Sequence, residues 1–210
     1  MSNLLPLSVG LIDCGIANLG SMVRILGELV NKVTVVTSPK DLAKADKLIL
    51  PGVGAFPIAM QRLTECELVE SIKELAIGDK KPILGVCLGM QLLASTGHEF
   101  EQTDGLGLIP GSVKRFVNTS KEFRIPHVGW NSVLFDQTSP LIDGIRDSTD
   151  FYFVHSYVYE LPDDKHLIGH ANHGVDFPAI VSSENIYGTQ FHPEKSSVAG
   201  FTLIKNFCGL

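Results

Sequence analysis

One cysteine, Cys87, stands in a sequence that suits a reactive thiol. The segment Gly85-Val86-Cys87-Leu88-Gly89 has the form G-x-C-x-G and joins a predicted buried strand, Pro82 to Val86, to a predicted helix, Leu88 to Ser95. It is the thiol counterpart of the G-x-S-x-G turn, which lifts a nucleophile above the end of a sheet. Flanking glycines relieve crowding in that turn, and a helix N-terminus favours the thiolate. We therefore predict that Cys87 is a nucleophile and that the amide of Leu88 donates to an oxyanion.

A second segment, Gln190-Phe191-His192-Pro193-Glu194, supplies a candidate base. Pro193 favours an extended conformation at His192, and residues two apart on an extended chain point to the same side. Glu194 is therefore expected to bind one imidazole nitrogen and leave the other for Cys87, as in triad enzymes. Each segment alone also has a non-catalytic interpretation. Cys87 would be a small buried cysteine in a tight turn, and His192 a surface histidine beside a solvated glutamate. The two segments together favour catalysis.

The loop Pro51-Gly52-Val53-Gly54-Ala55-Phe56 follows a third predicted strand. Gly52 and Gly54 permit close approach of the backbone to a ligand, so the amide of Val53 is a candidate second oxyanion donor. A plain strand-to-helix turn is equally rich in glycine and proline. The same glycines would allow the peptide around Val53 to flip, and we state as a hypothesis that such a flip switches this oxyanion donor on and off.

The remaining histidines and cysteines favour no metal or cofactor. His127 and His155 lie in apolar company and are expected to be hydrogen-bonded core residues. No other histidine has ligand-like spacing with a cysteine or a carboxylate, so no metal site is predicted. The four cysteines lie far apart without a C-x-x-C pair, which argues against a disulfide framework. We expect Cys14 to be a small packing residue.

The elements that must position these side chains alternate in the first half of the chain. Short β-branched runs predict strands, and amphipathic segments between them predict helices, the first with Asn18 as its N-cap. The predicted strands are Ser8–Asp13, Lys32–Thr37, Lys47–Leu50 and Pro82–Val86, and the predicted helices are Asn18–Val30, Glu65–Ile77 and Leu88–Ser95. This alternation predicts a parallel sheet with helices on both faces.

From Gly111 onward strand-like runs follow one another, and the chain closes with a predicted helix, Ser197–Phe207. The runs are Ser112–Phe116, Ser132–Phe135, Phe151–Tyr159, His166–Ala171, Ala179–Ser183 and Ile186–Phe191. We expect them to add antiparallel strands to the same sheet or to form a small second sheet. The closing helix is expected to point Val198, Phe201, Ile204 and Phe207 inward. With no linker or repeat, residues 1–210 are predicted to form one α/β domain.

Composition excludes several classes of protein. The chain has 210 residues, 44% of them hydrophobic, and a formal net charge of −6. Lysines and arginines are scattered, which argues against nucleic-acid binding. No apolar stretch is long enough to span a membrane, and the first residues lack a cationic leader, so a cytoplasmic protein is expected.

Three segments together resemble the triad-type (class I) glutamine amidotransferases: Pro51-Gly52-Val53-Gly54, Gly85-Val86-Cys87-Leu88-Gly89-Met90-Gln91 and Gln190-Phe191-His192-Pro193-Glu194. The resemblance implies a flavodoxin-like fold and a single glutamine amidotransferase domain. It implies that Cys87 attacks the side-chain amide of glutamine, that His192 moves protons and that Glu194 orients His192. Gln91 would contact the substrate, and Val53 and Leu88 would offer the oxyanion amides.

Further segments resemble the glutaminase subunit of imidazole glycerol phosphate synthase in histidine biosynthesis: Gly105 to Gly111, Pro126-His127-Val128-Gly129-Trp130-Asn131, Tyr152 to Tyr157, and Lys195-Ser196. This resemblance implies a separate (βα)8 cyclase as partner in a heterodimer. The complex would make imidazole glycerol phosphate and aminoimidazole carboxamide ribotide from the ammonia. Asn18, Trp130 and Lys195 match family positions that lie toward the cyclase, and no cofactor is implied.

One departure from that family keeps alternatives open. Cys14 and Ala17 stand where the family usually has an aromatic residue and a glycine. The same chemistry would also serve a cyclase-like partner that aminates a sugar for surface glycans. A non-catalytic scaffold subunit is a second alternative, although it would be expected to lose Cys87, His192 or Glu194. An unpartnered thiol hydrolase, such as a peptidase or a γ-glutamyl hydrolase on the same fold, is a third.

Overall fold

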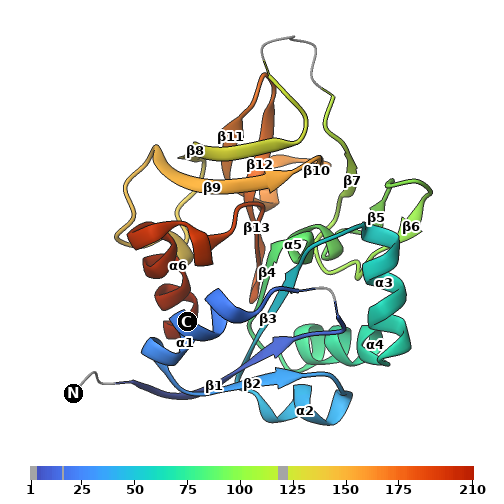
Figure 1. The fold of residues 1–210 in the computed structure, drawn as a ribbon, viewed down its shortest axis with the longest axis vertical. Coiled ribbons are helices and arrows are strands. Elements are labelled where there is room, and N and C mark those ends of the chain that lie inside the picture. The colour runs from blue at the N-terminus through green and yellow to red at the C-terminus, as the bar shows by residue number, and fades with distance from the viewer. Residues whose placement is uncertain (1–3, 16, 118–122) are drawn as a thin grey trace.

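A twisted mixed sheet with helices on both faces forms the body of the computed structural model, which describes residues 4–15, 17–117 and 123–210 (Figure 1). Met1 to Asn3, in the segment considered as a leader, and Ile16, in the loop with the family departure, lie outside this range. The large sheet has nine strands in the order β2-β1-β3-β4-β13-β12-β11-β8-β9. Its strands are β1 Leu5–Ile12, β2 Val30–Val36, β3 Lys47–Gly52, β4 Ile83–Cys87, β8 His127–Phe135, β9 Thr149–His155, β11 Leu167–Asn172, β12 Asp176–Ser183 and β13 Ile186–Thr189.

The strands β2, β1, β3, β4 and β13 run parallel, which confirms the parallel sheet predicted from the alternation of strands and helices. Their order makes the carboxyl ends of β3, β4 and β13 neighbours. Gly52 pairs with Cys87, and Thr189 pairs with Val86. The three segments that follow these strands therefore leave the same edge of the sheet side by side.

The C-terminal half adds antiparallel strands to the large sheet and also builds a small sheet, so both predicted arrangements occur. The small sheet has the order β10-β7-β5-β6. Its strands are β5 Thr96–Gly97, β6 Thr103–Asp104, β7 Ser112–Arg115 and β10 Tyr157–Glu160. The single strand predicted over Phe151–Tyr159 is wrong, because the chain leaves the large sheet after His155 and joins β7 from Tyr157.

Helices cover both faces of the sheet. In Figure 1, α1 Gly20–Leu29 and α6 Ser197–Gly209 lie together, and α3 Phe56–Glu65 and α4 Leu68–Lys73 lie apart from them. Leu26 of α1 and Leu203 of α6 belong to one buried cluster, whereas Leu63 of α3 and Ile72 of α4 belong to another. The described residues also form the α-helices α2 Pro39–Lys44 and α5 Leu88–Leu92.

Three predictions about the helices are wrong in detail. The helix predicted over Glu65–Ile77 instead ends α3 and begins α4, with Glu67 between them in a left-handed conformation (φ 59°). Val198 is 76% exposed, because α6 buries Leu203 and its neighbours instead. Asn18 is not the N-cap: Leu19 holds that position, and the side-chain Oδ1 atom of Asn18 accepts a hydrogen bond from the backbone amide of Gly20 at 3.4 Å.

No helix in the described part of the chain is long and apolar enough to cross a membrane.

Candidate active site

Cys87 lies in a strained turn between β4 and α5. Its φ and ψ are 54° and −109°, a conformation that costs a non-glycine residue free energy and persists only where its surroundings enforce it. A Cβ atom on Gly89 would lie 1.7 Å from the carbonyl oxygen of Leu50, and one on Gly85 would lie 2.6 Å from that of Gly89. The close approach of β3 therefore requires Gly89, and the tight packing of the turn against the start of α5 requires Gly85, as the G-x-C-x-G spacing predicts.

His192 and Glu194 meet directly after β13. The Nδ1 atom of His192 lies 2.8 Å from Oε1 of Glu194, and both side chains are less than a tenth exposed. His192 is extended, as predicted, but Glu194 lies in a 3₁₀ turn, Pro193–Lys195, and reaches the ring through that turn. Ser196 fixes the segment, because its hydroxyl donates to the His192 carbonyl at 2.6 Å and accepts from the amide of Tyr152 at 3.0 Å.

The charge state of His192 follows from its two neighbours. Burial disfavours the imidazolium, but hydrogen bonds and charge interactions with Cys87 and Glu194 outweigh it and raise the pKa of His192 to about 10. Since Nδ1 faces Glu194, Nε2 is the atom left for the sulfur. Within the described residues the other carboxylate oxygen of Glu194 is buried without a hydrogen-bond partner, so its charge acts mainly on His192. The arrangement favours an imidazolium that faces the sulfur of Cys87.

A cavity of about 380 Å³ opens over Cys87. It brings together most residues predicted for the site: Val53, Gly54, Cys87, Leu88, Gln91, His192 and Lys195. Glu194 lies behind His192 and does not line it. Val53 is half exposed, and Gly54 has a φ of 110°, a conformation that favours glycine. The cavity is large enough for an amino acid and has polar groups on several sides.

Sequence reasoning missed three polar groups, one beside the sulfur of Cys87 and two that line the cavity. Gln190 is fully buried, and its Nε2 atom lies 3.8 Å from Sγ of Cys87. Glu99 lines the cavity and accepts a hydrogen bond from the amide of Phe56 at 2.8 Å. His155, predicted to be a core residue, is buried and also lines the cavity. Gln190 is two residues before His192, a spacing that could have drawn attention to it, whereas Glu99 carries no local signal.

Two of the three predicted partner-facing residues lie against one aromatic ring. Trp130, 54% exposed on β8, and Lys195 contact the ring of Tyr152, with a ring–ring distance of 6.0 Å and an Nζ–ring distance of 5.9 Å. Asn18 is exposed at the start of α1. Lys195 also lines the cavity, so the Trp130–Tyr152–Lys195 patch adjoins its opening.

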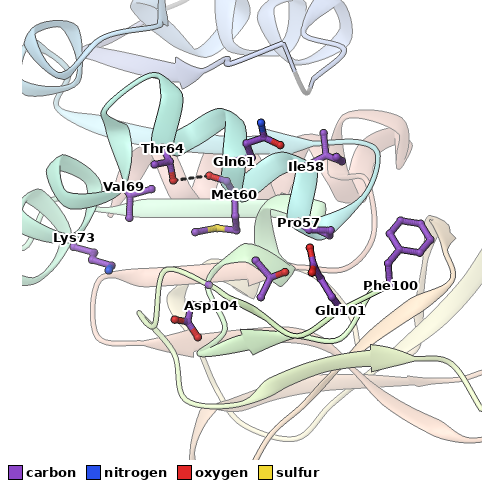
Figure 2. Close-up of a pocket in the computed structure, with 12 residues that line it drawn as sticks. Pro57, Ile58, Met60, Gln61, Thr64, Val69, Lys73, Phe100, Glu101 and Asp104 are labelled. Carbon is purple, nitrogen blue, oxygen red and sulfur yellow. Dashed lines mark hydrogen bonds between the residues drawn. The ribbon is translucent and has the colours of Figure 1, made fainter.

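Other hollows and clusters lack this chemistry. A larger cavity, about 570 Å³, lies between α3, α4 and β6 (Figure 2). Its wall joins apolar side chains of α3, such as Ile58 and Met60, to charged Lys73, Glu101 and Asp104, with no thiol or imidazole among its lining residues. Over the residues that the structure describes, no group of three or more His, Cys, Asp and Glu side chains could hold a metal ion.

Comparisons with known proteins agree with this geometry. The family profile described as glutamine amidotransferase class-I matches residues 10–208. The chain is 43% identical over 202 residues to the imidazole glycerol phosphate synthase subunit HisH of Shouchella clausii, covering 95% of this chain and 96% of the relative. It is 41% identical to the HisH subunit of Methanocaldococcus jannaschii, covering 96% and 99%. Among solved structures, PurLQS from Thermotoga maritima matches with a TM-score of 0.74 at 17% identity, covering 98% of this chain and 99% of that one.

Proposed function

The chain belongs to the class I glutamine amidotransferase family, and from this premise we propose that it is the glutaminase subunit of an imidazole glycerol phosphate synthase. The observation that carries the proposal is the placement of Cys87 and His192 at one cavity, with Glu194 directly behind His192, at the carboxyl edge of the parallel strands. Relatives at 41–43% identity along nearly the whole chain support the pathway.

In the proposed reaction the thiolate of Cys87 attacks the side-chain carbonyl carbon of glutamine. The amides of Val53 and Leu88 donate to the oxyanion of the tetrahedral intermediate. The His192 imidazolium gives its proton to the departing nitrogen, and ammonia leaves. His192 then takes a proton from water, whose oxygen attacks the γ-glutamyl thioester, and glutamate and the thiolate are released. Glu194 holds His192 in the orientation that both steps need.

The polar lining of the cavity suits the amino-acid end of glutamine. Among the residues that line the cavity, Glu99 is the acidic one and would face the α-ammonium group of glutamine. Lys195 is the basic one. Gln91 lines the same cavity, with its Nε2 atom bonded to the protein, so its Oε1 atom is the acceptor left for the substrate. A thiol hydrolase for larger peptides would need a longer open groove than this cavity.

We infer that the ammonia passes to a separate (βα)8 cyclase in a heterodimer. The cyclase would combine it with a phosphoribulosyl-formimino aminoimidazole carboxamide ribonucleotide and form imidazole glycerol phosphate and aminoimidazole carboxamide ribotide. The exposed Trp130 beside the cavity opening supports a partner on that face, and Asn18 is a further candidate contact. A sugar-aminating partner is not favoured, since the relatives carry the histidine-pathway name, and a non-catalytic scaffold would not need the retained triad.

The test is glutamate release with and without a histidine-pathway cyclase and its ribonucleotide. We expect the cyclase and ligand to raise the rate, and Cys87→Ala to abolish glutamine-dependent turnover while synthesis from added ammonia continues in the complex. Ammonia-dependent synthesis controls for folding and assembly. Glutamine hydrolysis by the Cys87→Ala variant would contradict the assignment of the nucleophile.

A further inference from the structure

The backbone carbonyl of Tyr157 joins two chains of hydrogen bonds, one of which ends at Cys87. On the first branch, Nε2 of Gln91 donates to this carbonyl and to Oε1 of Gln190, both at 3.0 Å. Nε2 of Gln190 then lies 3.8 Å from the sulfur of Cys87. On the second branch, Nδ1 of His155 lies 2.9 Å from the same carbonyl. The carbonyl thus links an imidazole to the nucleophile through two amides.

A carbonyl oxygen can only accept, and this fixes the direction of the first branch. The Gln91 group that faces Tyr157 must be its NH₂, whose second hydrogen bonds to Gln190. Gln190 must therefore turn its oxygen to Gln91 and its N–H to Cys87. In the opposite orientation two NH₂ groups would face each other, and an amide oxygen would face the thiolate. Gln190 is fully buried, so water cannot relieve either conflict.

The same carbonyl fixes the second branch. Nδ1 of His155 must carry its proton, so Nε2 accepts from Nδ1 of His127 at 2.9 Å. Nε2 of His127 accepts in turn from the amide of Asn131 at 3.3 Å, and that amide also donates to the carbonyl of Asn172 at 2.8 Å. His127 and His155 are directly opposite each other on β8 and β9. Both rings are held neutral, each in a single tautomer.

The groups around the sulfur of Cys87 favour opposite protonation states of that sulfur. His192 and the N–H of Gln190 favour the thiolate, because both donate to it. The carbonyl of Val154 on β9, 3.6 Å from the sulfur, can bond only to the protonated thiol. Glu99, Lys195 and the neutral His155 line the same cavity. Among the described residues, Gln190 is therefore the uncharged side chain that donates to the sulfur, and its orientation decides whether it stabilises or opposes the nucleophilic form.

We propose that Gln190 is a further catalytic residue, a fixed N–H donor to the thiolate of Cys87, and that His155 and His127 are positioning residues that hold it in this orientation through Tyr157 and Gln91. The proposal rests on the proposed role of Cys87 as nucleophile. It assigns a function to two buried histidines that the triad does not use. It also makes the orientation of the Gln190 N–H donor depend on Asn131, which is one residue from the exposed Trp130 on β8.

The proposal is tested by the rate at which iodoacetamide alkylates Cys87 between pH 6 and 9, followed by the mass of the Cys87 peptide. Half-buried Cys66 in the same chain is the internal reference. We expect Gln190→Met, which keeps the volume and removes the donor, to slow alkylation of Cys87 about tenfold at pH 7 and to move the pH–rate profile upward. Should Gln190→Met not fold, Gln190→Glu keeps the shape and is expected to slow alkylation at least as much.

Position 155 offers a matched set of variants. His155→Leu removes the donor to Tyr157 and is expected to slow alkylation severalfold, whereas His155→Asn places an amide N–H near the former Nδ1 atom and is expected to recover most of the rate. A purely structural role would make the loss follow thermal stability in both variants. Equal rates for wild type and Gln190→Met, or equal losses for His155→Asn and His155→Leu, would overturn the proposal. A wild-type Cys87 no faster than Cys66 would instead contradict its role as nucleophile.

Discussion

Two buried histidines line the cavity over Cys87, and they have opposite charge states. Burial acts on both rings in the same direction, against the imidazolium. Even so, the pKa of His192 is raised to about 10 and that of His155 is lowered to about 4. The neighbours account for the difference, since His192 faces Cys87 and Glu194, whereas His155 faces a carbonyl and the ring of His127.

The backbone around the two rings differs as well. The nucleophile region, Gly85–Gly89 with Gln190–Glu194, packs a strained turn against β3. The histidine-pair region, His127 and His155, belongs to a regular antiparallel ladder between β8 and β9. In this protein the nucleophile region holds a charged imidazole against the carboxylate of Glu194, and a regular ladder carries a neutral pair of histidines beside it. Burial alone would predict a neutral ring at both positions, which is wrong for His192.

The largest effect is expected from Glu194→Gln, which removes the carboxylate that holds His192 charged. An amide N–H facing Nδ1 would select the other tautomer, so we expect the kcat for glutamine hydrolysis in the complex to fall about a thousandfold. Exposed Glu184, replaced by Gln, is the matched control and should leave kcat unchanged. A loss of less than about tenfold would show that His192 does not depend on Glu194.

The strain in the nucleophile region predicts the next effect. A Cβ at Gly89 would overlap the Leu50 carbonyl oxygen, so Gly89→Ala is expected to lower the free energy of unfolding by about 3 kcal/mol or more. Gly27, exposed within α1, has nothing within 4 Å of the same position, and Gly27→Ala is expected to raise stability by about 0.5 to 1 kcal/mol. Urea unfolding of both variants measures the difference. Similar stabilities for the two variants would contradict the close contact between β3 and the turn.

The histidine pair predicts a smaller, pH-dependent effect. The pKa of His155 is about 4 in the folded chain and about 6.5 when unfolded, so the unfolded chain binds more protons between these values. Its contribution to stability is present above about pH 6.5 and is lost as the pH falls toward 4. His155→Asn removes this group, so the stability of wild type relative to the variant should fall by about 2 to 3 kcal/mol between pH 7 and pH 4. A difference that does not change with pH would show that His155 is not held neutral.

The sequence predicted the parts of the site that depend on local backbone. The G-x-C-x-G spacing predicts the turn at Cys87 because glycine is needed wherever another backbone comes within contact distance. The spacing of His192 and Glu194 predicts their contact, although a 3₁₀ turn makes it rather than an extended chain. The alternation of strands and helices likewise predicts the parallel half of the sheet.

What escaped prediction depends on pairing across long distances. Glu99 reaches the cavity from a loop between two-residue strands, which are too short to leave a periodic pattern. His127 and His155 are 28 residues apart, and only the register of β8 and β9 brings them together. The change of sheet at Ser156, between β9 and β10, depends on pairing with β8 before it and with β7 after it. Local residue preferences do not contain that information.

The most direct test of the account uses a diazoketone analogue of glutamine, which alkylates a nucleophile that lies against the substrate's side-chain carbonyl. The complex with the cyclase is treated with the analogue, and the labelled peptide is identified by mass. We predict one label per chain, on Cys87, with glutamine protecting against it and with none on Cys87→Ala. A label on Cys66 or another residue, or labelling that glutamine does not slow, would contradict the account.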